Sequence, residues 1–165
     1  MKYLNEQFDL GAESQEDSST SVEALEAQLA AVQERLKESA PQIDAPQWRQ
    51  LALQEGRLLV NLERGHAAWQ SARWCFDQFC AARLWSEAIE AARIMFQSGE
   101  PDALVALGHG VWLAVTFPVD PELSVALLQD IIEETPDDSD GAAVAAAVAA
   151  YVVDLRAEGK ERESL

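Results

Sequence analysis

Residues 84–101, LWSEAIEAARIMFQSGEP, carry the pattern that decides the fold of this chain. Apolar residues recur there every three or four positions, a spacing that places them on one face of an α-helix. The residues on that face are Trp85, Ala88, Ile89, Ala92 and Met95. Gly99 and Pro101 follow, and both residue types commonly mark the end of a helix. The stretch therefore predicts an amphipathic helix with one buried face.

Similar stripes occur on both sides of this segment, separated by junctions that hold most of the Pro and Gly residues. A capping box at Thr20 and Glu23 predicts the start of the first helix, and Gly65 is expected to end the second. The remaining helices are expected at 66–82, 85–96, 104–117, after Asp120, and after a cap at Ser139. No segment shows the sustained alternation of a β-strand. We predict an all-α fold of about seven short antiparallel helices, stacked as helical hairpins.

Two of these helices carry specific expectations about burial. The segment from Leu104 to Phe117 is apolar on all sides, which predicts the central helix of the fold. The first helix has a seam with the spacing of a coiled coil, formed by Val22, Leu25, Leu29, Val32 and Leu36. We expect this seam to pack against the rest of the domain, with a homodimer through residues 21–38 as the alternative.

The 165 residues carry a formal net charge of −17, distributed unevenly. Residues 1–44 have a net charge of −7, residues 45–100 are neutral, and residues 101–165 have −10. Composition predicts a disordered acidic leader at 1–20, one helical domain at 21–158 and a flexible charged tail at 159–165. The acidity argues against direct binding of nucleic acid or of an anionic membrane, since both attract Lys and Arg.

The N-terminal residues lack the apolar run of a secretory signal. Cys75 and Cys80 lie five positions apart in a helical pattern, so their side chains are expected to point about 140° apart. That geometry does not suit a disulfide, and two reduced thiols predict a cytoplasmic protein.

Residues 84–101 also resemble the second helix of a tetratricopeptide repeat, a motif matched by Trp85, Ala88, Ala92 and Pro101. The following Leu107–Gly108 resembles the pair that opens the next repeat, and the likeness covers about residues 72–136. Phe76 departs from it, because the motif has a small residue there. An irregular α-solenoid or bundle is therefore the alternative. The size and acidic tail are also similar to helical-repeat chaperones of type III secretion systems. These resemblances imply binding of a peptide or a helix.

The sequence shows no pattern that predicts a catalytic residue, a cofactor or a metal site. Gly108–His109–Gly110 lacks the third glycine of a phosphate-binding loop, and is expected to let a neighbouring helix approach closely. His66 and His109 are too few for a zinc site without cysteine partners. An enzyme or ligand-binding domain with His109 in a pocket is the third of three functional hypotheses.

The leading hypothesis is a non-enzymatic protein-binding module, an adaptor or accessory chaperone with a basic protein partner. Trp and Arg are enriched at binding hot spots, and the neutral middle of the chain holds four of five Trp and six of nine Arg. We expect the contact surface to include Arg57, Arg64, Trp69, Arg73 and Trp74, with Arg57 and Arg64 sharing a helix face. The second hypothesis is an acidic regulatory protein that mimics nucleic acid and blocks a basic site.

Overall fold

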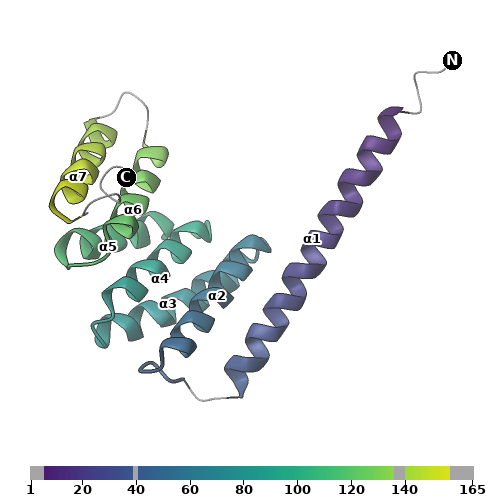
Figure 1. Ribbon diagram of the computed structural model, residues 1–165, viewed down its shortest axis with the longest axis horizontal. Coiled ribbons are helices and arrows are strands. Elements are labelled where there is room, and N and C mark those ends of the chain that lie inside the picture. The colour runs from purple at the N-terminus through teal and green to yellow at the C-terminus, as the bar shows by residue number, and fades with distance from the viewer. Residues whose placement is uncertain (1–5, 39–40, 136–139, 157–165) are drawn as a thin grey trace.

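The fold is all-α in a computed structural model that describes residues 6–38, 41–135 and 140–156, with side chains from Ser21 onward. Seven helices and no strands occur within these ranges (Figure 1). Their bounds are α1 (Glu6–Lys37), α2 (Pro46–Asn61), α3 (Gly65–Ala81), α4 (Trp85–Gln97), α5 (Ala103–Thr116), α6 (Pro121–Glu134) and α7 (Asp140–Arg156). The all-α prediction is confirmed, and the middle helices lie within a few residues of the ranges expected from periodicity.

Two expected boundaries are wrong. Helix α1 begins at Glu6 rather than at the capping box of Thr20, because no proline interrupts residues 6–20 and a formed helix extends at little cost. The helix thus includes much of the segment for which composition predicts a disordered leader. Gly65 does not end α2, which stops at Asn61, but is the first residue of α3. The Ser139 cap and the tail at 159–165 lie outside the described residues, and the domain division stays a prediction.

The helices form a stack in which each one packs against the next in the chain (Figure 1). Helix α4 also contacts α2 and α6, so these three helices are neighbours in one layer. The stack thus consists of successive hairpins, and each hairpin is covered by the helix that follows it. This arrangement is compatible with a helical repeat.

Helix α4, and not α5, is the central helix. It packs against α2, α3, α5 and α6, and Ala88, Ile89 and Ala92 have no exposed surface. The expectation that the segment from Leu104 to Phe117 would be central is wrong, since Leu104 and Trp112 in α5 are 63% and 61% exposed. Helix α5 packs mainly against α4 and α6, which together cover one side of it.

Most of the seam of α1 packs within the chain, although Val22 is 50% exposed. Leu29 and Val32 are buried against Leu58, Leu59 and Ala68 of the α2–α3 hairpin, and Gln33 donates a 3.0 Å hydrogen bond to Glu55. Two of the residues expected in a homodimer through residues 21–38 are therefore covered by α2 and α3.

Candidate functional site

The five residues expected to bind a partner do not form one continuous surface. Arg57 pairs with Glu90 of α4, whereas Arg64 pairs with Glu26 of α1. The expectation that these two arginines share a helix face is wrong, because Arg64 lies beyond Asn61, the last residue of α2. Their guanidinium groups instead hold α2 and the turn after it to two different neighbours.

The other three residues lie on α3 but on different sides of it. Trp69 is half-buried, and with Arg73 it lies on the side of α3 that carries Phe76, whose ring stacks against His109 of α5. Trp74 lies away from that side and contacts Trp48 edge-on, with ring centroids 5.8 Å apart. Trp74 is 43% exposed. Binding of a partner by any of the five remains a prediction.

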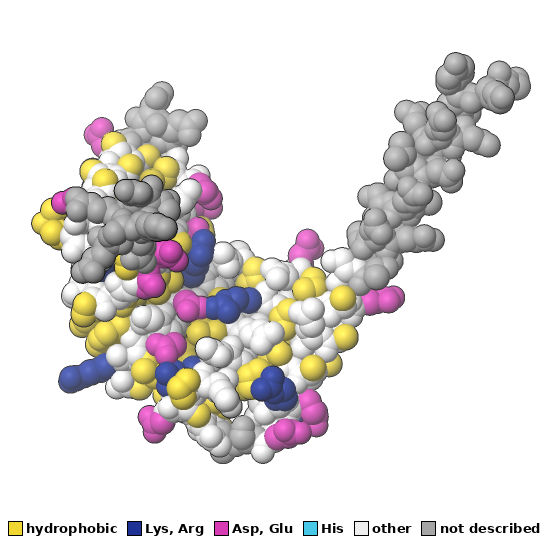
Figure 2. Space-filling model, viewed as in Figure 1, with side chains coloured by type: hydrophobic (Ala, Val, Ile, Leu, Met, Phe, Trp, Pro, Cys, Tyr) yellow, Lys and Arg dark blue, Asp and Glu magenta, His cyan; other side chains and the backbone are white. Residues whose placement is uncertain are grey.

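The layer of α2, α4 and α6 carries a ladder of ion pairs. Arg49 Nε lies 2.7 Å from Glu87, Arg57 pairs with Glu90, and Arg93 contacts both carboxylate oxygens of Asp130 at 2.7 and 3.1 Å. Basic and acidic side chains accordingly lie next to one another on the face shown in Figure 2.

In this ladder Arg49 and Arg57 pair with carboxylates of the neutral segment 45–100, whereas Arg93 pairs with Asp130 outside it. Most of the arginines that suggested a binding surface are paired with carboxylates of the chain itself. Partly exposed pairs of this kind hold helices in position, but each contributes little to stability because water and salt screen them.

Helix α5 carries four of the exposed large apolar side chains among the described residues. Leu104, Val105, Trp112 and Val115 are between 42% and 63% exposed, and their spacing places them on one side of the helix. We call these four residues the α5 apolar face. Gly108 lies among them with open space around it, so the expected close helix approach holds only for Gly110, which faces Ala92 and Leu127.

An aromatic cluster supports one end of this face. The Trp85 ring of α4 stacks on Phe117 with centroids 3.8 Å apart and planes within 9°, and Trp112 contacts Phe117 edge-on at 6.1 Å. Contacts of this kind fix ring orientation and add to burial energy. Trp112 is therefore held in place although most of its surface is exposed.

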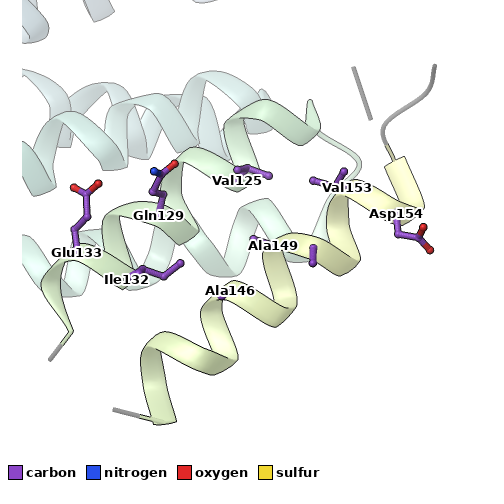
Figure 3. A pocket seen from close by; sticks show the side chains of 9 residues that line it. Val125, Gln129, Ile132, Glu133, Ala146, Ala149, Val153 and Asp154 are labelled. Carbon is purple, nitrogen blue, oxygen red and sulfur yellow. The ribbon is translucent and has the colours of Figure 1, made fainter. Parts of the chain in front are cut away.

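A groove of about 560 Å³ lies between α6 and α7 (Figure 3). Val125, Ile132, Ala149 and Val153 are among its apolar lining residues, and Glu133 lies at its edge. Arg156 ties the end of α7 to the end of α5, because its guanidinium donates to the carbonyls of Ala114 and Val115 at 2.7 and 2.9 Å. The walls of the groove are thus connected to the rest of the stack.

Several ionisable side chains in the described part of the chain form ion pairs between helices. No group of three or more His, Cys, Asp or Glu side chains is arranged there to hold a metal ion. His109 is exposed and stacks on Phe76, outside the α6–α7 groove. Burial, reinforced by the Glu55 carboxylate, raises the pKa of the Cys75 thiol to about 12, which makes this cysteine a poor nucleophile.

None of the helices within the described ranges has the length and apolar character needed to span a bilayer. The α5 apolar face and the α6–α7 groove were both missed by sequence reasoning. The sequence does carry a signal for the α5 apolar face, because α5 is apolar on all sides. That pattern predicts burial within the chain equally well. Comparison with known proteins assigns no family, because no family model, curated protein or solved structure matches the chain.

Proposed function

We propose that the protein is a non-enzymatic protein-binding module, an adaptor or accessory chaperone, that holds a segment of another protein against the α5 apolar face. The observation that carries this proposal is the exposure of Leu104, Val105, Trp112 and Val115 on one side of a helix. Contiguous exposed apolar residues commonly mark interaction surfaces, because water contact with them is unfavourable.

The composition and support of this face favour binding. Trp112 is the residue type most enriched at binding hot spots, and its contact with Phe117 reduces the conformational entropy that binding would cost. Trp69 and Arg73 of α3 lie on the side of that helix that approaches His109 of α5. These two residues of the sequence-based surface extend the proposed contact area.

We further infer that α3 and α4 form one tetratricopeptide-like hairpin. Three motif positions, Trp85, Ala88 and Ala92, fall in α4, and both alanines are completely buried. Small residues at these positions allow close packing of the two helices, as the repeat requires. An irregular helical stack is the alternative.

The proposal is tested with the full chain, tagged and used for quantitative affinity capture from its native cells. The Leu104→Gln/Trp112→Gln double variant removes two large side chains from the α5 apolar face without adding charge. We expect a protein that the wild type captures to be lost from this variant. Val144→Gln/Tyr151→Gln is the matched control, because both residues are large exposed apolar side chains of α7 that lie outside the α5 apolar face and the α6–α7 groove.

An unchanged set of captured proteins would show that the α5 apolar face does not bind. Capture at high salt distinguishes the proposed binding module from an acidic mimic of nucleic acid. Apolar contact should survive about 1 M NaCl, whereas at that concentration interactions between charges are screened within about 3 Å. Loss of the captured protein at that salt concentration would favour a mimic of nucleic acid.

A further inference from the structure

The α6–α7 groove lies at the open end of the helical stack. Helix α4 contacts both helices of the α2–α3 hairpin, and α6 contacts both helices of the α4–α5 hairpin. In the described residues, no helix covers the α6–α7 hairpin in the same way. The groove faces away from α4, because Asp130, which pairs with Arg93 of α4, lies about 140° and 160° around α6 from the groove residues Val125 and Ile132.

The dimensions and lining of the groove suit one more helix. Its lining residues extend from Val125 to Glu133 on α6 and from Ala146 to Asp154 on α7, which is about 12 Å along each helix axis. Two helical turns of a partner would fit that length, with apolar anchors at positions i, i+3 or i+4, and i+7. In Figure 3 the side chains of Ile132 and Val153 lie along the space between the two helices.

The charge around the groove indicates which kind of helix could bind there. The described residues of α6 and α7 include six acidic side chains and one basic one, Arg156, whose guanidinium already binds carbonyls of α5. Glu133 lies at the groove edge and pairs with no Lys or Arg among the described residues. A second copy of this chain would bring a further net charge of −17 to this acidic end, and like charges oppose association. Residues 157–165, AEGKERESL, lack the apolar stripe that the groove requires.

We propose that the α6–α7 groove binds an amphipathic helix of a partner protein that carries Lys or Arg beside its apolar stripe. The helix completes the stack by covering Val125, Ile132, Ala149 and Val153, while its basic side chains approach Glu133. This inference rests on the proposed function, since it names a second contact site and the partner chemistry of the same binding module.

The test uses a fluorescent model helix of about 18 residues, or five turns, with Leu and Ala on one face and Lys on the other. A matched peptide carries Glu in place of Lys. Binding to the full chain is measured by fluorescence anisotropy. Ala146→Lys/Ala150→Lys places two cations in the groove, and Ala143→Lys/Ala147→Lys is the control. All four alanines are exposed on α7, but Ala143 and Ala147 do not line the groove.

We expect saturable binding of the Lys peptide that falls about tenfold in the groove variant and less than about twofold in the control. The Glu peptide should bind more weakly than the Lys peptide, and Glu133→Gln should reduce that difference. Absence of saturable binding by the wild type, equal loss in both variants, or equal affinity for both peptides would overturn the inference.

Two further outcomes separate this inference from the proposed function. If the groove variant binds normally while Leu104→Gln/Trp112→Gln does not, the groove assignment is wrong and the α5 apolar face remains supported. If sedimentation shows a wild-type dimer that the groove variant dissociates, the occupant is a second copy and the partner assignment is wrong.

Discussion

Gly65 has no side-chain carbon, which allows the start of α3 to pack closely against the turn after α4. A Cβ atom placed there would lie 2.2 Å from the carbonyl oxygen of Ser98, in the turn after α4. That oxygen belongs to the backbone, so it cannot move aside as a flexible side chain could. The glycine is therefore required by packing between α3 and the α4–α5 turn, which local sequence does not reveal.

We expect Gly65→Ala to lower the free energy of unfolding by about 2–3 kcal/mol, because the methyl group forces the turn away from α3. Gly108→Ala is the matched control, since its Cβ would meet nothing within 4 Å. It should raise stability by about 0.5–1 kcal/mol through its better helix propensity. Urea denaturation measures both. Equal effects of the two substitutions would contradict the packing explanation.

The two cysteines should differ from ordinary thiols in their reactivity. The pKa of Cys75 is raised from 9.0 to about 12 by burial and then by Glu55, and burial followed by the Asp77 charge raises the pKa of Cys80. We expect iodoacetamide at pH 8 to leave Cys75 unmodified in the folded protein and to modify it in urea, as followed by mass spectrometry. Rapid modification of folded Cys75 would contradict its burial.

The raised pKa of Cys75 also predicts a pH dependence of stability. Folding favours the neutral thiol, so its contribution is complete below pH 9 and is lost as the pH rises towards about 12. Replacing Cys75 with Ala should reduce the decline in unfolding free energy over this range, which denaturant titrations at successive pH values would measure.

Between elements, the turns after α2 and α3 have the same geometry. Glu63 and Arg83 adopt positive φ angles of 56° and 58°. In each turn the next residue donates a backbone hydrogen bond to the last helical turn, from Arg64 to Leu59 at 2.8 Å and from Leu84 to Phe79 at 2.9 Å. This is the Schellman arrangement, which normally places glycine at the position with positive φ. The turn after α4 has Gly99 with a φ of 70°.

We expect Glu63→Gly and Arg83→Gly each to raise the unfolding free energy by about 0.5–1 kcal/mol, because glycine removes the strain of a left-handed residue. Thermal and urea denaturation would measure the gain. Glu63→Ala is the control and should give none, since alanine keeps its Cβ. A similar gain from alanine would show that loss of the charge, and not relief of backbone strain, is the cause.

At the scale of the whole molecule, the effect of a substitution on stability depends on whether it lies in the central helix of the stack. Ile89 of α4 is completely buried and Leu104 of α5 is 63% exposed, although both belong to apolar segments. We expect Ile89→Ala to lower the unfolding free energy by about 2–5 kcal/mol. Leu104→Ala should change it by less than about 0.5 kcal/mol. Chemical denaturation of the two variants tests the assignment, and the reverse order would place α5 at the centre.

Because Leu104 is exposed, the effect of a substitution there on partner binding can be measured separately from its effect on stability. A substitution there should leave stability nearly unchanged while weakening partner capture. For Ile89 the two effects could not be distinguished. The exposed side of α5 is therefore the better place for functional variants.

The sequence by itself determined that the chain is helical and gave approximate limits for the middle helices, but not the start of α1. The apolar spacing in residues 84–101 and the following Gly99 and Pro101 predicted α4 closely, because helix formation and termination depend on residues within one or two turns. The seam of α1 likewise predicted burial of Leu29 and Val32. The same reasoning identified Trp and Arg in the middle of the chain but could not say which of them are exposed.

Tertiary structure alone decided which faces meet. Arg57 and Glu90 are 33 residues apart, and nothing in local sequence predicts that they pair. The hydrophobicity of α5 predicts that its surface avoids water, but not whether this chain or another protein covers it. The spacing of apolar residues reflects interactions along one helix. The positions of α4, α5 and the α6–α7 groove depend instead on how all the helices pack together.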